Sequence, residues 1–75
     1  MNEAEELLDS AVNINPEFAA AWMNRGIVKA ALAKQGEAEL SYRTAIRHRR
    51  NYPDCWYNLG NLVCILFDIF CLFFI

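Results

Sequence analysis

The chain has 75 residues, of which 56% are hydrophobic and 21% are charged, and its formal net charge at pH 7 is -2. A chain this short forms at most one small domain, which excludes a large enclosed active site. The charge is polarised, because acidic residues gather near the start and arginines gather around residues 43–50. The net charge therefore says little about partners.

The apolar periodicity and the breaks between segments predict four helices, at about residues 2–13, 17–33, 37–50 and 54 onward. Pro16 is well placed to begin the second helix, because proline tolerates the first helical position. Gly36 is expected to adopt a left-handed cap between the second and third helices. Asp54 is expected to cap the start of the fourth helix.

The cysteines and the start of the chain carry no address or metal signal. Cys55, Cys64 and Cys71 include no CxxC pair and have no histidine nearby, so buried free thiols are expected instead of a zinc site or a disulfide framework. The start, MNEAEELL, lacks the basic and apolar regions of a secretory signal. No N-terminal targeting segment is therefore expected.

An internal repeat emerges when Trp22 is set over Trp56, a separation of 34 residues. The run AWMNRGIVK at 21–29 then lies over CWYNLGNLV at 55–63, with tryptophan, asparagine and glycine matched. One period further back, the first helix has small or apolar residues at the positions of Ala38, Tyr42 and Ala45; these are Ala4, Leu8 and Ala11.

This pattern resembles the tetratricopeptide repeat, whose signature runs WxxLGxxY, then AxxxF, Ala and Pro. The residues that carry the signature here, and for which a structural role is expected, are Trp22, Gly26, Ala38, Tyr42, Ala45, Trp56, Leu59 and Gly60. Small residues let two antiparallel helices cross closely, and the aromatic residues fill the space beside them. Arg25 and Lys29 depart from the signature; their stems are expected to pass the helix edge, at a cost in stability.

The expected fold class is all-α, a fragment of an α-solenoid made of tetratricopeptide-type helix-turn-helix repeats. Residues 1–18 are expected to form helix B of a preceding repeat, and residues 19–52 a complete repeat. Residues 53–61 would start a further helix A, and residues 62–75 would form a divergent hydrophobic tail.

Two runs, AAAWMNRGIV and AELSYRTAIRHRRNYPDCWYNLGNL, resemble the luminal repeats of the transmembrane and tetratricopeptide repeat-containing proteins, and the fourth member most. The likeness covers about residues 3–62. It implies an endoplasmic-reticulum location and a link to the O-mannosylation of cadherins. In that family the multi-spanning N-terminal part carries the glycosyl-transfer machinery; this chain contains no such part and is not expected to be an enzyme.

The tail departs from the repeat. Between Leu62 and Ile75 only Asp68 is polar, and fourteen helical residues extend about 21 Å, short of the ~30 Å hydrocarbon core. A spanning helix is not expected. A foreign C-terminus from splicing, a frameshift or an incomplete gene model is favoured over a buried helix, and the tail is expected to give self-association or weak membrane binding.

Catalytic chemistry is not indicated anywhere in the chain. His48 lies among arginines at a helix C-terminus, where positive charge complements the helix dipole. Arg43, Arg47 and Arg50 share a helix face and could bind phosphate or an acidic peptide, but nucleic-acid binding is not expected. Glu3, Glu5 and Glu6 occupy a first helical turn, which explains them without a catalytic pair. We expect no cofactor, metal or catalytic residue.

The predicted function is that of a protein-interaction segment, in which the concave face of successive A helices receives a peptide or partner protein. The resemblance places the partner-binding residues at Ala20, Met23, Asn24, Ile27, Ala31, Tyr57, Asn58 and Asn61. Two alternatives stay open: a non-catalytic repeat portion of an O-mannosyltransferase acting on cadherin-type proteins, or a membrane-associated peptide acting through its tail. Trp22, Ile27 and Tyr42 could also be core residues.

Overall fold

The structure, a computed structural model, describes the backbone of residues 3–74 and the side chains of residues 3–64. The described residues form four helices and no strand: α1 (Glu3–Ile14), α2 (Ala19–Ala31), α3 (Gln35–His48) and α4 (Pro53–Phe74). The expected all-α class is confirmed. Expectations for the side chains of residues 65–75, including Asp68 and Cys71, lie outside the described residues.

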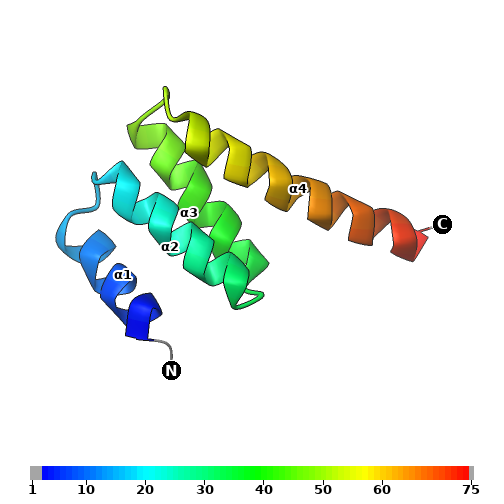
Figure 1. The fold of residues 1–75 in the computed structure, drawn as a ribbon, viewed down its shortest axis with the longest axis horizontal. Helices are drawn as coiled ribbons and strands as arrows, with labels where there is room; N and C mark the ends of the chain where they lie inside the picture. Colours follow the sequence, from blue (N-terminus) through cyan, green and yellow to red (C-terminus); the bar gives the residue numbers. More distant parts are fainter. Residues whose placement is uncertain (1–2, 75) are drawn as a thin grey trace.

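The helices follow one another in space as they do in the sequence. The antiparallel pair α2 and α3 forms the centre, with α1 against α2 and α4 against α3 (Figure 1). The first part of α4 also contacts α2, while its C-terminal part runs away from the bundle as a continuous helix (Figure 1). Because no turn interrupts α4, the chain does not return to cover it within the described residues.

A buried cluster joins α3 to the start of α4, and it consists of Ala38, Tyr42, Ala45, Tyr52, Cys55, Leu59 and Leu62. Side chains of α2, including Trp22 and Met23, pack against it. The thiol of Cys55 donates to the carbonyl of Tyr42 at 3.4 Å, and burial raises the pKa of that thiol. Cys64 is exposed, so the expectation of buried thiols is wrong at that position.

Helices α2 and α3 cross closely at Gly26. A Cβ atom there would lie 2.5 Å from Cε1 and 2.6 Å from Cδ1 of the buried Tyr42 ring. Its counterpart one repeat later, Gly60, is exposed and has no described neighbour within 4 Å of such an atom. The two glycines therefore occupy equivalent positions in the sequence but opposite packing environments.

The turn after α2 differs from the expectation. Ala33, at φ 61°, takes the left-handed conformation, whereas Gly36 lies inside α3. The amide of Ala33 donates to the carbonyl of Ala30, and the amide of Lys34 donates to that of Lys29. This pair of hydrogen bonds is a Schellman motif, which needs the left-handed residue directly after the helix cap Leu32, three positions before Gly36.

The two other expected helix starts are also corrected. Helix α2 begins at Ala19, so Pro16 lies in the preceding turn, where its carbonyl accepts a 2.7 Å hydrogen bond from Nε1 of Trp22. Helix α4 begins at Pro53, so Asp54 belongs to its first turn instead of capping it. One repeat later Nε1 of Trp56 donates to the carbonyl of Arg50 at 2.9 Å. The tryptophan bond therefore recurs with the repeat.

The paired glycines generate a stability prediction. Gly26→Ala should lower the free energy of unfolding by about 1 to 3 kcal/mol, because the added methyl group overlaps the ring of Tyr42. Gly60→Ala should raise it by up to about 1 kcal/mol, since alanine favours the helix and meets nothing. Urea unfolding followed by circular dichroism measures both. Equal effects of the two substitutions would contradict this crossing.

Candidate partner-binding surfaces

The face on which partner binding is predicted lies on α2 and the first turns of α4. Its exposed members are Asn24, Ile27, Ala31, Tyr57 and Asn61. The half-buried members are Ala20, Met23 and Asn58. Because α2 contacts α4, the two sets lie on neighbouring helices. The assignment of these residues to partner binding stays a prediction.

The chemistry of this face is apolar with amides. Tyr57 is 71% exposed and Ile27 is 43% exposed, so Ile27 is not the core residue that the alternative interpretation allowed. Tyr42, in contrast, is buried, and Trp22 packs against the core. Asn24 and Asn61 add amide groups that can both donate to and accept from a peptide backbone.

Two hollows lie away from this face. One is on the opposite side of α2, and the other is at the equivalent place one repeat later. The first, of about 260 Å³, is lined by Asp9, Val12, Asn13, Trp22 and Arg25. The second, of about 420 Å³, is lined by Arg43, Ile46, Arg47, Arg50, Trp56 and Leu59. Adding 34 to each lining residue of the first hollow gives a lining residue of the second. The surface therefore repeats, while its charge changes.

An ion-pair network fills the space between α1, α2 and α3 beside the first hollow. Nζ of Lys29 lies 2.8 Å from a carboxylate oxygen of Glu5, and Lys29 is only 3% exposed. Nζ of Lys34, from the turn after α2, contacts the same oxygen at 2.7 Å. Glu5 therefore ties α1 to two points on α2 and its turn.

Arg25 extends this network to α3. Its Nε lies 2.8 Å from Asp9 of α1, one terminal nitrogen donates to the hydroxyl of Ser41, and the other lies 3.8 Å from Glu37. The expectation that the Arg25 and Lys29 stems pass the helix edge is thus wrong. Both side chains turn inward and hold three helices together.

The pairing shifts the protonation of its members. Hydrogen bonds from Lys29, and then from Lys34, lower the pKa of Glu5 from 4.5 to about 2. The hydrogen bond to Glu5 raises the pKa of Lys29, against the effect of its burial. Both groups therefore carry their charges throughout the neutral range.

A sequence signal for this network exists. Glu5 and Asp9 are four residues apart in the first helix, as are Arg25 and Lys29 in the second. Residues four apart share a helix face, so the sequence places two acids opposite two bases on antiparallel helices. In the repeat signature the two bases are departures, and the helix dipole accounts for Glu5 but not for Asp9.

The described residues offer neither a metal cluster nor a membrane span. No group of three histidine, cysteine, aspartate or glutamate side chains among residues 3–64 could hold a metal ion. No helix in the described part of the chain is both long and apolar enough to cross a bilayer. Tail-mediated membrane binding stays a prediction, since it depends on side chains beyond residue 64.

Comparison with known proteins gives one relationship. No protein-family model matches the chain. Over 60 residues the sequence is 34% identical to the protein O-mannosyl-transferase TMTC3 of Homo sapiens, and 34% identical over 60 residues to that of Mus musculus. The match covers 80% of this chain, 7% of the human protein and 6% of the mouse protein. The similarity supports a relationship to a small part of TMTC3, in agreement with the family resemblance.

The shifted pKa of Glu5 predicts the pH dependence of stability. A lowered pKa stabilises the fold above about pH 4.5, and this contribution is lost as the pH falls toward 2. Glu5→Gln should therefore lower the unfolding temperature at neutral pH. The difference in unfolding temperature between this variant and the parent chain should disappear as the pH falls from about 4.5 to 2. Thermal unfolding by circular dichroism at several pH values measures it.

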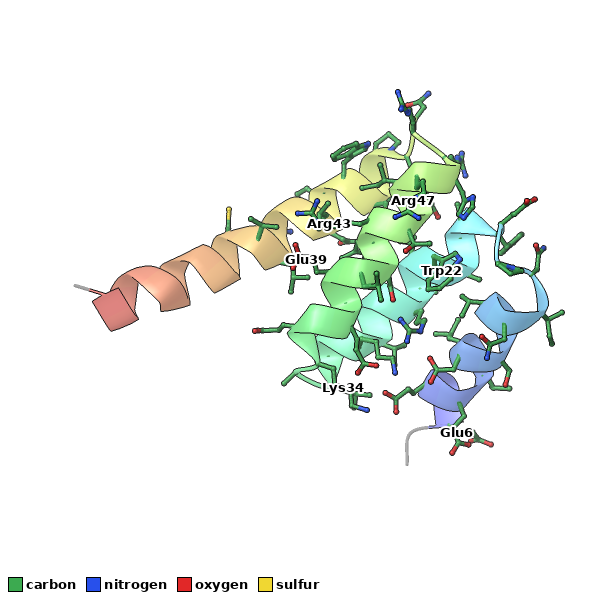
Figure 2. The ribbon with its side chains drawn as sticks, turned by 180° about the vertical axis from the view of Figure 1, so that it is seen from behind. Glu6, Trp22, Lys34, Glu39, Arg43 and Arg47 are labelled. Carbon is green, nitrogen blue, oxygen red and sulfur yellow. The ribbon has the colours of Figure 1, made fainter. Side chains whose placement is uncertain are left out.

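The matched control is Glu6→Gln, an exposed glutamate in the same helical turn (Figure 2). This substitution should leave the unfolding temperature nearly unchanged at every pH. A Glu5→Gln gap that persisted unchanged at pH 2 would show that charge pairing does not hold α1 in place.

Proposed function

We propose that this chain is a protein-interaction segment that binds a peptide or partner protein along the α2 and α4 face. The observation that supports the proposal most is the exposure of Ile27 and Tyr57 on two helices in contact. An exposed isoleucine on one repeat helix and an exposed tyrosine on the helix beside it can both contact apolar anchor residues of a ligand. The asparagines beside them would pair with its backbone.

The ligand that fits this face is apolar and has little net charge. The predicted set contains no cationic side chain, whereas three of the chain's arginines, Arg43, Arg47 and Arg50, line the second hollow on another face. An acidic ligand would gain little from this face. Binding here requires no reacting group, so the proposal is recognition without catalysis.

Selection from a displayed peptide library tests this proposal. Peptides with apolar anchors should be enriched on the immobilised full chain, and their affinity, measured by fluorescence anisotropy, should fall at least about tenfold in Ile27→Glu and in Tyr57→Glu. That loss corresponds to about 1.4 kcal/mol, in the range of an interface anchor.

Leu40→Glu is the matched control. Leu40 is 57% exposed on α3, so the substitution adds the same charge outside the predicted face. Selected peptides should bind this variant as they bind the parent. If Leu40→Glu weakened binding as much as Ile27→Glu, or if no peptide were enriched, the predicted face would not be the binding surface.

We also propose that the segment serves as a non-catalytic repeat portion of an O-mannosyltransferase that acts on cadherin-type proteins in the endoplasmic reticulum. The 34% identity to TMTC3 over 60 residues supports this second function. Within that family we assign the segment to the fourth member, because of the run from Ala38 to Leu62 with its irregular HRRNYPDC stretch. Substrate recognition would then be its contribution.

A chimera tests the second proposal. Residues 3–62 replace the matching 60 residues of human TMTC3, and mannose transfer to a cadherin domain is measured in cells that lack the parent enzyme. The chimera should retain transfer, and a second chimera with Gly26→Leu should lose it, because the repeat no longer packs. Loss of transfer in a chimera that is expressed and inserted normally would contradict an equivalent role.

A further inference from the structure

One face of α4 is exposed, although the equivalent face of α2, one repeat earlier, is covered. Gly26 and Lys29 are buried where α3 crosses α2, with the Tyr42 ring against Gly26. Their counterparts 34 residues later, Gly60 and Val63, are exposed. Helix α4 therefore has the small residue required for a close helix crossing, without a described helix against it.

Helix α1 carries the pattern that would fit there. Helix α3 presents Ala38, Tyr42 and Ala45, all buried, and α1 has Ala4, Leu8 and Ala11 at the same spacing. None of these three α1 residues is buried, because α1 turns Glu5 and Val12 toward α2 instead. Beside them Leu7 is 67% exposed.

We propose that copies of this chain associate head to tail, with α1 of one copy docked on α4 of the next, in the position that α3 occupies on α2. The stack continues the α-solenoid across separate chains. It goes beyond the proposed peptide binding, because it uses the side of α4 that bears Trp56, Gly60 and Val63 instead of the side that bears Tyr57 and Asn61.

The change from Arg25 to Leu59 between the two repeats supports α1 of a second copy as the helix that docks on α4. Within one chain, Arg25 lies between two carboxylates, Asp9 of α1 and Glu37 of α3. One repeat later the arginine position holds Leu59, and the aspartate position holds Arg43.

In the proposed contact Glu3 of the second copy takes the position of Glu37, because Ala4 takes that of Ala38. The two flanking groups then have opposite charges, so Arg43 and that Glu3 can pair directly without a bridging cation. The hydroxyl of Ser41, which bonds Arg25, is replaced by Leu7 of the second copy against Leu59. The two contacts that Arg25 makes with α3 thus have an ionic and an apolar substitute.

The charges at the two ends of the molecule agree with this direction. The second hollow, beside α4, is lined by Arg43, Arg47 and Arg50, two of which Figure 2 shows in a row along α3. The helix that would dock beside it begins with three glutamates in its first turn. Because the two contacting surfaces differ, the contact is heterologous, and it predicts head-to-tail rows or rings instead of a symmetric dimer.

Sedimentation velocity on the full chain tests the proposal, with a reducing agent present because Cys64 is exposed. Association of the parent should rise with concentration and weaken with salt, since exposed ion pairs are screened. Gly60→Leu and Leu7→Lys should each weaken association at least about tenfold, a loss of about 1.4 kcal/mol. Helix content should be unchanged in both variants, because both residues are exposed in the single chain.

Gly36→Leu and Leu40→Lys are the matched controls, because Gly36 also has open space around it and Leu40 is also an exposed leucine, on α3. Both should associate like the parent. A monomeric parent at every concentration, or oligomers that resist salt, Gly60→Leu and Leu7→Lys alike, would overturn the proposal; the second result would place self-association in the hydrophobic tail.

Charge reversal tests the direction of the stack. Arg43→Glu and Glu3→Arg should each weaken association, and the double variant should recover it. An equimolar mixture of the two single variants should also recover association, as alternating rows, because both kinds of junction between unlike variants bring a carboxylate against a guanidinium. Failure of the double variant to recover association would overturn the pairing. Peptide binding at Ile27 and Tyr57 is measured separately, so either proposal can fail alone.

Discussion

The ring of Tyr42 lies where a side chain at residue 26 would have to be, and this contact sets the distance between α2 and α3. The same residue also holds α4, because its carbonyl accepts the thiol of Cys55 and its side chain belongs to the cluster with Leu59 and Leu62. Three helices thus converge on one tyrosine. A glycine at the crossing is needed because any Cβ would force the buried ring to move.

Helix α1 is attached by another kind of interaction. Its buried residues are Glu5 and Val12, so ion pairs replace most of the apolar contact that fastens α4. Charges in such surroundings lose hydration when they pair, and their net contribution to stability is small, but leaving one of them unpaired is costly. The network therefore specifies which face of α1 meets α2 more than it adds to stability, and it leaves the other face accessible.

The helices and their crossing could be predicted from the sequence, because periodicity, prolines and the 34-residue spacing act locally or within one repeat. The interior roles of Arg25 and Lys29 could not be seen in the repeat signature, since their partners lie 16 and 24 residues earlier in a different helix. The prediction that Gly36 takes the left-handed position in the turn was also wrong, because Ala33 takes that position and Gly36 is helical. Hydrogen bonding fixed that position, and glycine's freedom did not.

The indole of each repeat tryptophan reaches back six residues to a carbonyl in the turn before its helix. No side chain caps the start of α2, so this hydrogen bond joins the helix to the turn that precedes it. The tryptophan that holds each turn against its helix therefore belongs to the repeat that follows the turn. A gene segment of one period can be duplicated or inserted in register and still carry this tryptophan, which gives arrays of this kind a simple way to change length.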